Sequence, residues 1–431
     1  MQTQLAPAFA NTADGQAAEA ILRKCVHCGF CTATCPTYQL LGDELDGPRG
    51  RIYLIKQVLE GAPATASTQQ HLDRCLTCRN CETTCPSGVH YGELVDIGRR
   101  VVDAQVPRVW WQRALRAALV HGLTSAAFAP AMRLGQRVRA WLPAALQAKV
   151  PEAQATRALP TRTHAKKMLL LAGCVQPAML PNVHVATARV LDAMGIQAVL
   201  APQAGCCGAL AYHLSNEARA LQQARANIDA WWPLLQQDGM QGLLMNASGC
   251  GVMVKDYGHV LRNDPVYAER AAHISAMTRD AAECLPQWLD TLQPLVAAKA
   301  AQQPALVVHP PCTLQHGQQV NDLPAQLAAL GFATRVANTD AHLCCGSAGT
   351  YSVLQPKLSE QLRQRKLQAL APKPAEVVVS ANVGCITHLQ GGASVPVRHW
   401  LEVLDDALSN PNPNASPGYN APLPANQTAQ T

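Results

Sequence analysis

Residues 25–36 read CVHCGFCTATCP, and residues 75–86 read CLTCRNCETTCP. Both stretches have the form Cys-x2-Cys-x2-Cys-x3-Cys-Pro, and every cysteine of the second lies 50 positions after its counterpart in the first. Two-residue gaps let one tight loop present three thiols to a single centre, and the proline after the fourth cysteine turns the chain away. This doubled run is the strongest pattern in the sequence, and it decides the fold of the N-terminal part.

The spacing of these eight cysteines predicts two [4Fe-4S] clusters. In chains with this spacing, each run supplies three thiolates to one cluster and its fourth thiolate to the other. The expected ligand sets are Cys25, Cys28, Cys31 and Cys85 for cluster one, and Cys75, Cys78, Cys81 and Cys35 for cluster two. Because the exchanged cysteines tie the two loops together, we expect the clusters to lie close enough for direct electron transfer.

Zinc and disulfides are the alternatives for the same cysteines. Zinc sites pair C-x2-C knuckles across a longer stretch, whereas three cysteines fall within seven residues here, so the spacing favours iron–sulfur clusters. The N-terminal residues MQTQLAPAFANTADGQ lack the basic start and apolar run of a secretory signal. We therefore expect a cytoplasmic protein whose thiols stay reduced and available to metal.

The composition indicates several domains and one basic segment. About two or three domains are expected for 431 residues, and no stretch has the ~18 uninterrupted apolar residues of a membrane span. The net charge of +6 comes from residues 108–149, which hold seven Lys/Arg and no Asp or Glu. Because the positive charge is confined to this one segment, it gives no indication of nucleic-acid binding.

The basic segment has three interpretations. With Trp110, Trp111 and Trp141, it suits peripheral contact with an anionic inner membrane surface. It suits the acidic face of a partner subunit equally well. The third interpretation is an amphipathic linker with a solvated basic face.

A second duplication follows, again marked by cysteines. Each copy has one cysteine, then a Cys-Cys-Gly turn whose first cysteine lies 32 residues later, then a last cysteine. Strands are expected at 166–173, 196–202 and 242–248, then at 304–311, 333–338 and 375–384, with helices at 181–195 and 323–332. This alternation predicts α/β units with parallel sheets, whose sites lie beyond the strand ends. The landmark cysteines are Cys174, Cys206, Cys207 and Cys250, and then Cys312, Cys344, Cys345 and Cys385.

The landmark cysteines could bind a metal ion or further iron–sulfur clusters, or form a redox disulfide. Their spacing alone does not select among these. Cys284 fits neither copy and is expected to be a buried small hydrophobic residue. The nearby histidines are expected to be hydrogen-bonded structural side chains, namely His213, His309, His342 and His388.

The two kinds of repeat together resemble the heterodisulfide-reductase-like iron–sulfur subunits. Within that group, the segment RKCVHCGFCTATCPTYQLLGDELDGPRGRIYLIKQVLEG at residues 23–61 looks like the iron–sulfur subunit of bacterial glycolate oxidase, most specifically over LGDELDGPRGR. The resemblance runs from about residue 18 to about residue 408. It departs from the heterodisulfide reductase pattern because the endings Cys250-Gly-Val-Met253 and Cys385-Ile-Thr-His388 lack a last cysteine. This departure counts against the non-cubane cluster of that family.

The resemblance implies an electron-transfer subunit with no catalytic residue of its own. An FAD-binding partner subunit would oxidise glycolate to glyoxylate, and this chain would pass the electrons towards a quinone or another carrier. The flavin would be on the partner only, and no G-x-G-x-x-G fingerprint stands out in this sequence. The alternatives are a catalytic subunit of heterodisulfide reductase type and the iron–sulfur subunit of a lactate or glycerol-3-phosphate dehydrogenase.

Two arginines between the cysteine runs have two interpretations. Arg49 and Arg51 could raise the potential of a cluster through their positive charge. They could instead form ordinary salt bridges or contacts at a helix start.

The expected fold class is α+β and multi-domain. An α-helical two-cluster ferredoxin domain is followed by two duplicated α/β Cys-Cys-Gly (cysteine-rich) domains. Helices at 49–59 and 92–106 flank the first cysteine loops. The expected boundaries are 15–105 for the ferredoxin-type domain, 106–165 for a basic helical connector, 166–290 and 303–408 for the two Cys-Cys-Gly domains, and 409–431 for a disordered tail.

Overall fold

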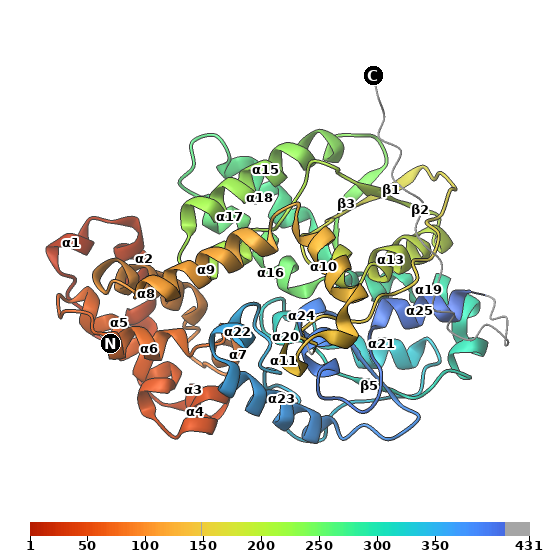
Figure 1. Ribbon diagram of the computed structural model, residues 1–431. Helices are drawn as coiled ribbons and strands as arrows, with labels where there is room; N and C mark the ends of the chain where they lie inside the picture. Colours follow the sequence, from red (N-terminus) through yellow and green to blue (C-terminus); the bar gives the residue numbers. More distant parts are fainter. Residues whose placement is uncertain (148, 410–431) are drawn as a thin grey trace.

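The structure is a computed structural model that describes residues 1–147 and 149–409. An N-terminal helical unit, a helical connector and two parallel sheets with helices around them follow one another along the chain (Figure 1). The predicted α+β, multi-domain fold class is confirmed. Apart from Ser409, the predicted tail at 409–431 lies outside the described residues.

The N-terminal unit is helical because apolar residues recur at helical spacing between good helix starts. Helix α5 (Pro48–Leu59) begins with a proline, which suits the first helical position. Helix α8 (Tyr91–Gln105) buries Leu94, Val95 and Val102 on one face. These helices match the two that were predicted beside the cysteine loops. The other elements are α1 (Pro7–Ala10), α2 (Ala13–Lys24), α3 (Phe30–Ala33), α4 (Pro36–Leu41), η1 (Glu44–Asp46), α6 (Ala66–Asp73) and α7 (Asn80–Thr83).

The core of this unit lies directly behind the cysteine loops. Ile55 of α5 packs against α8 at Gly98, where an added Cβ would lie 2.6 Å from the Ile55 side chain. Cys25, Cys75 and Cys81 belong to the same cluster of buried residues. The thiols are therefore presented by a packed apolar core.

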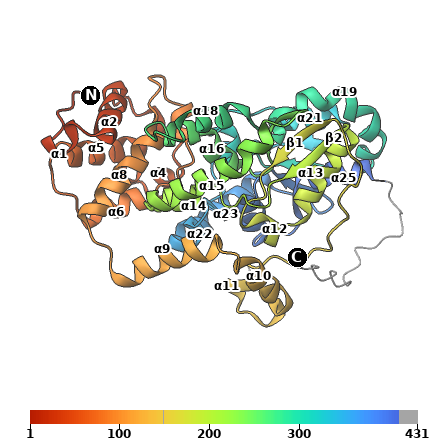
Figure 2. The same cartoon turned by 90° about the horizontal axis from the view of Figure 1, so that it is seen from above.

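The connector crosses from the helical unit to the repeats. Helix α9 (Trp110–Leu123) makes this crossing, and the short helices after it lie at the edge of the molecule (Figure 2). Among the described helices, none has both the length and the apolar character needed to cross a membrane. The remaining connector elements are α10 (Phe128–Arg137), η2 (Arg139–Trp141) and α11 (Ala144–Gln147).

Each Cys-Cys-Gly repeat contains a four-stranded parallel sheet. The strand orders are β2-β1-β3-β4 and β6-β5-β7-β8, so the two sheets have the same topology. All six predicted strands are present, and the fourth strand of each sheet was missed. The strands are β1 (Lys166–Leu170), β2 (Ile196–Leu200), β3 (Met240–Met245), β4 (Thr278–Asp280), β5 (Leu306–Val308), β6 (Thr334–Arg335), β7 (Val377–Ser380) and β8 (Val397–His399).

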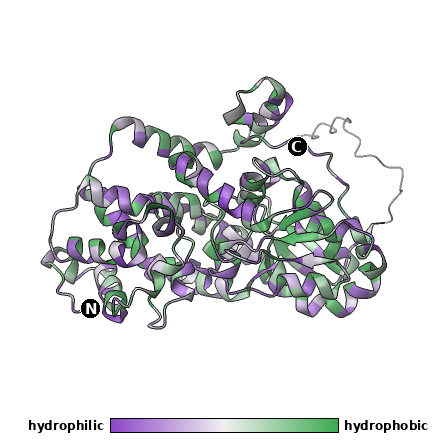
Figure 3. Ribbon diagram, turned by 90° about the horizontal axis from the view of Figure 1, so that it is seen from below, coloured by the Kyte–Doolittle hydropathy of each residue, from purple (hydrophilic) through white to green (hydrophobic). Residues whose placement is uncertain are grey.

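The helices of the repeats pack against the sheets and against each other. Figure 3 shows the apolar character of the strands, which are covered by helices of mixed hydropathy. The first repeat contains α12 (Gln176–Met179), α13 (Asn182–Ala193), α14 (Ala209–His213), α15 (Glu217–Leu235), α16 (Ser248–Lys255), α17 (Tyr257–Val260), α18 (Ala268–Met277) and α19 (Ala281–Ala300). The second contains α20 (Cys312–Gln315), α21 (Leu323–Ala329), α22 (Tyr351–Leu354), α23 (Pro356–Leu370), α24 (Val383–Gln390) and α25 (Trp400–Leu408).

One hydrophobic core joins the two repeats. It contains Leu170 and Leu244 from the first sheet and Val308 and Val379 from the second. Helices α13, α19, α21 and α25 contribute the residues between them, including the buried Trp400. Because the core is continuous, the two repeats hold their strand ends in a fixed relation.

Candidate iron–sulfur sites and the central cavity

The loop between α2 and α3 presents the first group of cysteines. His27 and Gly29 have φ of 57° and 85°, a left-handed conformation that bends the chain tightly around the space inside. Cys25 and Cys28 of this loop and Cys31 of α3 line a cavity together with Cys85 from the second run. Cys81 of the second run also lines this cavity.

A second cavity adjoins the first. It is lined by Cys35, Cys75, Cys78 and Cys81, the set expected for cluster two. Cys81, Pro48 and Tyr91 line both cavities, so the two share a wall. The structure thus brings the eight N-terminal cysteines together in two adjoining groups of four.

The distances between the sulfurs test whether these cavities fit a single ion or a larger group. Within the described ranges, no three of the cysteine sulfurs lie inside 4.8 Å of one another. Thiolates on one zinc ion would lie about 3.8 Å apart, because each Zn–S bond is about 2.3 Å long. Four thiols spaced more widely around a cavity fit an inorganic cluster better than a zinc ion.

Burial favours the neutral thiol form at several of these cysteines. It raises the pKa of Cys31 to about 11, and it raises the pKa of Cys78 and Cys81 further above the ordinary value. A buried thiolate is stable only beside positive charge. These thiols would therefore need a bound cation, such as the iron of a cluster, to stay ionised.

Hydrogen-bond donors surround the sulfur of Cys75. The hydroxyl of Tyr91 donates to Cys75 Sγ over 3.6 Å, and the backbone N–H of Thr77 donates to it over 3.4 Å. Arg99 donates to the backbone oxygen of Cys75 over 2.6 Å and so holds the loop itself. Hydrogen bonds of this kind to cluster sulfurs are one of the means by which a protein sets a cluster potential.

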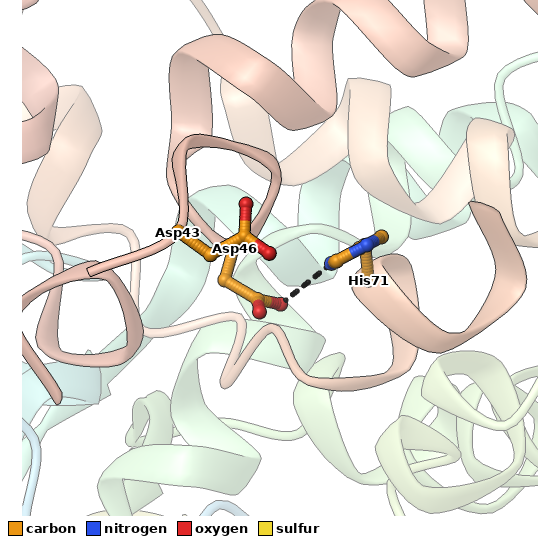
Figure 4. A group of neighbouring side chains, drawn as sticks. All are labelled: Asp43, Asp46 and His71. Carbon is orange, nitrogen blue, oxygen red and sulfur yellow. Dashed lines mark hydrogen bonds and ion pairs between the residues drawn. The ribbon is translucent and has the colours of Figure 1, made fainter. Parts of the chain in front are cut away.

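A buried charge network lies beside cluster two. The Asp46 carboxylate lies 3.0 Å from His71 Nδ1 (Figure 4). It also accepts from Arg74 over 2.7 Å and lies 3.4 Å from Arg51 Nη2. Asp43, Asp46 and His71 place oxygen and nitrogen donors close enough for a cation. The two arginines already neutralise the Asp46 carboxylate, so this group is better described as an ion-pair network.

The two arginines discussed above occupy different environments. Arg51 is 1% exposed, and it also donates to Thr37 Oγ1 and to the backbone oxygen of His71. Arg49 is 38% exposed, pairs with Glu44 over 2.7 Å and lines the cavity of cluster one. Both therefore form salt bridges, and Arg51 does so in the interior.

The landmark cysteines of the repeats lie beyond the carboxyl ends of the parallel strands. Cys174 follows β1, Cys206 and Cys207 follow β2, and Cys250 lies in α16 after β3. In the second repeat, the corresponding cysteines lie after β5, β6 and β7. The Cys312 and Cys344 sulfurs are 3.8 Å apart. The two Cys-Cys-Gly turns are alike, with φ of 91° at both Gly208 and Gly346.

The landmark cysteines meet at one large central cavity with a volume of about 530 Å³. The helical unit, the connector and both repeats contribute to its walls. Cys345 is buried in the core of the second repeat and does not line the cavity. The cysteines that line it are Cys75, Cys174, Cys206, Cys207, Cys250, Cys312, Cys344 and Cys385.

The histidines near the landmark cysteines make hydrogen bonds. His309 Nδ1 lies 3.0 Å from Ser380 Oγ, and burial lowers the pKa of His309 to about 3. Burial lowers the pKa of His388 to about 4, and its ring contacts Ser359. His213 pairs with Asp96 of the helical unit over 3.3 Å, and His342 accepts through its backbone oxygen.

Sequence reasoning missed how the second repeat covers cluster two. Leu76, between Cys75 and Cys78, packs in one apolar group with Cys344, Tyr351 and Leu362. The Asn80 amide donates to the backbone oxygens of Thr34 and His342 and so bridges the two units. No local pattern in the sequence pairs segments more than two hundred residues apart.

Two family models match this chain. The 4Fe-4S dicluster domain matches residues 21–89, and the cysteine-rich domain matches residues 168–255 and 306–390. The first match includes the eight N-terminal cysteines, and the other two include the eight landmark cysteines.

Similar proteins cover most of the chain. The glycolate oxidase iron-sulfur subunit of Escherichia coli (strain K12) is 50% identical over 411 residues, which are 95% of this chain and 99% of that protein. The probable glycolate oxidase iron-sulfur subunit of Bacillus subtilis (strain 168) is 29% identical over 87% of this chain and 89% of its own length. Lactate utilization protein A of an Exiguobacterium species is 26% identical over 56% of this chain and 97% of its own length.

Proposed function

We propose that this chain, which belongs to the glycolate oxidase iron–sulfur subunit family, relays electrons within an enzyme complex. The electrons would come from a flavoprotein partner that oxidises glycolate to glyoxylate. They would then pass towards a quinone-type acceptor. As an iron–sulfur subunit, it is one component of an oxidoreductase complex. The flavin belongs to the partner in this proposal, and this chain supplies no catalytic residue.

The observation that carries the proposal is the pair of adjoining four-thiol cavities. The first is assigned Cys25, Cys28, Cys31 and Cys85, and the second Cys75, Cys78, Cys81 and Cys35. Two [4Fe-4S] clusters held there would supply one-electron oxidation and reduction. The residues of the chain hold the loops, exclude water and aim hydrogen-bond donors at the sulfurs.

The exposure of the two sites gives the relay a direction. Cys28 is exposed, and Val26 and Phe30 beside it are 68% and 60% exposed. Cluster two is covered by the second repeat at Leu76. A partner flavoprotein therefore reaches cluster one first, and electrons leave cluster one through the shared wall at Cys81.

Iron analysis combined with partner-dependent reduction tests this function. The anaerobically prepared chain is expected to contain about eight irons for two clusters, or about sixteen if the repeats hold clusters as well. Glycolate should reduce the clusters, as seen by EPR, only after a flavoprotein partner is added. Cys78→Ser should lower the iron content and stop electron flow, while Cys284→Ser should leave both unchanged.

Three results would contradict the proposal. The first is a colourless, iron-free chain, and the second is a Cys78→Ser variant with full electron flow. The third is disulfide reduction by the isolated chain, which would favour the alternative of a catalytic heterodisulfide-reductase-like subunit.

Lactate is the second candidate substrate for the complex. The similarity to proteins named lactate utilization protein A favours it. Because the substrate would bind the flavoprotein, the identity of that partner decides between glycolate and lactate. Cluster reduction by lactate and not by glycolate, after the flavoprotein partner is added, would select the lactate complex.

The connector is the proposed contact with the membrane surface. Trp110, Trp111 and Trp141 are 74%, 52% and 85% exposed, and exposed arginines lie between them. Interfacial tryptophans combined with basic residues favour an anionic lipid surface. Co-sedimentation with phosphatidylglycerol vesicles should weaken when the three tryptophans are replaced by serine. Unchanged binding would leave the acidic partner face or the solvated linker as the role of residues 108–149.

A further inference from the structure

The central cavity is much larger than the spaces around the N-terminal cysteines. Its volume is about 530 Å³, against about 30 and 20 Å³ for the other two. Small-molecule sites have volumes of roughly 300–1,000 Å³ and are mostly apolar with a few polar groups. The cavity therefore has the size of a site for a ring compound.

Two different kinds of side chain line this cavity. The strand ends of the repeats contribute partly exposed thiols, including Cys174, Cys250 and Cys312. The connector contributes apolar side chains with no thiol among them, namely Leu119, Leu123, Phe128 and Met132. Any cluster on the landmark cysteines would occupy the thiol-lined part, and the part beneath the connector would still need an apolar occupant.

The cavity shares a wall with the proposed cluster two. Cys75 and Leu76 line both the cluster-two cavity and the central cavity. Side chains of the cluster-two loop therefore lie between the two spaces. A molecule in the central cavity would lie beside the last N-terminal redox centre of the relay.

Both arginines at the cavity wall are already paired with carboxylates. Arg116 pairs with Asp73 over 3.0 Å, and Arg99 donates to backbone oxygens and pairs with Asp96. Lys149 donates to the backbone oxygen of Ser352 over 3.4 Å. Arg116 and Arg99 thus have carboxylate partners, whereas the hydrogen-bond partner of Lys149 is a backbone oxygen. Because the rest of the lining is mostly apolar, it favours a lipophilic ligand.

We infer that the central cavity is the binding site of the electron acceptor, a lipophilic quinone whose ring lies between the connector helices and the strand ends. The inference rests on the proposed function, and it adds the place where the relay ends. Each glycolate releases two electrons, which cross this chain one at a time. The quinone takes up these two electrons and two protons from water and leaves as quinol, while glycolate becomes glyoxylate.

The position of the connector accounts for access to the site. Its inner face lines the cavity at Leu123 and Phe128, and its outer face carries the exposed Trp110 and Trp111. A quinone dissolved in a membrane would therefore meet the cavity at the segment that faces the lipid. In this arrangement the quinone would move from the membrane to the cavity without passing through bulk water.

Photolabelling tests the site on the cluster-loaded chain without any partner. A short-chain azidoquinone is expected to label peptides from 116–132 and from the strand ends, and unlabelled short-chain ubiquinone should compete. Leu123→Trp fills the cavity and should lower labelling at least about tenfold, which corresponds to about 1.4 kcal/mol. Met132→Trp repeats the test from a second helix. Ala118→Trp is the matched control, because Ala118 lies on the exposed side of the same helix α9 and does not line the cavity.

A kinetic arm separates this inference from the proposed function. With the flavoprotein partner, Leu123→Trp should lose glycolate-dependent quinone reduction and keep dye reduction within about twofold of the wild type. Labelling elsewhere on the chain, or equal labelling of Leu123→Trp and Ala118→Trp, would overturn the inference. A failure of glycolate to reduce even the dye would instead overturn the proposed function, because the labelling does not depend on the partner.

Discussion

The guanidinium of Arg51 lies 3.4 Å from the carboxylate of Asp46, and both side chains are buried, at 1% and 0% exposure. The pair joins α5 to the η1 turn, and the backbone oxygen of Asp46 lies 3.7 Å from the sulfur of Cys35. An interior ion pair thus holds a loop that carries a proposed cluster ligand. Its effect on stability differs from that of a surface pair, because Arg51 is a buried donor to Asp46, to Thr37 Oγ1 and to the backbone oxygen of His71. Asp46 keeps Arg74 and His71 as partners when Arg51 is lost.

Arg51→Met is expected to destabilise the N-terminal unit by about 1–3 kcal/mol, because buried acceptors lose their donor while Arg74 still neutralises Asp46. The measurement is the thermal unfolding midpoint of the cluster-loaded protein. Arg49→Met is the matched control, since this half-exposed pair with Glu44 should contribute no more than about 1 kcal/mol. Equal effects of the two variants would show that the buried pair has no special role.

Gly346→Ala is expected to destabilise the protein more than Gly208→Ala. Both glycines have φ of 91°, which strains any other residue. An added Cβ would lie 2.6 Å from Ser359 O at Gly346 and 3.0 Å from Ala220 O at Gly208. We expect a cost of about 1–3 kcal/mol at Gly208 and a larger one at Gly346, measured by denaturant midpoints. The reverse order would contradict the steric argument.

Asp280→Asn is expected to change how stability depends on pH. Burial raises the pKa of Asp280 to about 6, although it caps α19 through Ala282 N–H and accepts from Gln318. The folded protein then binds a proton that the unfolded chain releases, so the contribution of Asp280 is present below pH 3.8 and lost as pH rises through 6. Lys255 and Glu283 are the charged groups that face it.

The measurement for Asp280 is the difference in unfolding midpoint between Asp280→Asn and the wild type at several pH values, under anaerobic conditions. From pH 5 to pH 7 the variant should gain about 1 kcal/mol relative to the wild type, since most of the pKa difference of Asp280 lies below pH 5. Effects of acid on the clusters are common to both proteins and cancel in this difference. A constant difference would mean that Asp280 titrates at its ordinary pKa.

Asn80→Ala is expected to loosen the contact between the helical unit and the second repeat. The Asn80 side chain is 2% exposed, and its loss would leave the backbone oxygens of Thr34 and His342 without this donor. The expected cost is about 1–3 kcal/mol, with faster hydrogen exchange around residue 342. Thr83→Ala, which removes an exposed contact with His316, should have a smaller effect. Iron content, measured in parallel, separates a loosened contact from a lost cluster.

Local pattern was sufficient to predict the fold class and most of the strands. The run from Val377 to Val379 is buried on both faces, so it is apolar throughout and easily recognised. The strand Thr278–Asp280 has three residues and includes the exposed Arg279, so its pairing with β3 depends on tertiary contacts alone. Strand β8 (Val397–His399) was missed for the same reason.

The cysteines of the candidate site could be predicted from the sequence, but the residues that pack around them could not. Spacing alone indicated that Cys85 would join the first run of cysteines, and Cys85 does line that cavity. The packing of Leu76 against Tyr351 and the arrival of Leu123 at the central cavity depend on how separate units dock. Docking is set by the shapes of whole surfaces, which no short motif encodes.

The contacts at Asn80, together with the ion pair between Arg79 and Asp256, fasten the helical unit to the repeats. In the proposed relay, electrons would then cross this chain between units that keep a fixed position relative to one another. No domain would have to move between the electron donor and the electron acceptor for an electron to pass through the chain. Raising solvent viscosity with glycerol should slow the encounter with soluble partners and leave the internal passage at its original rate.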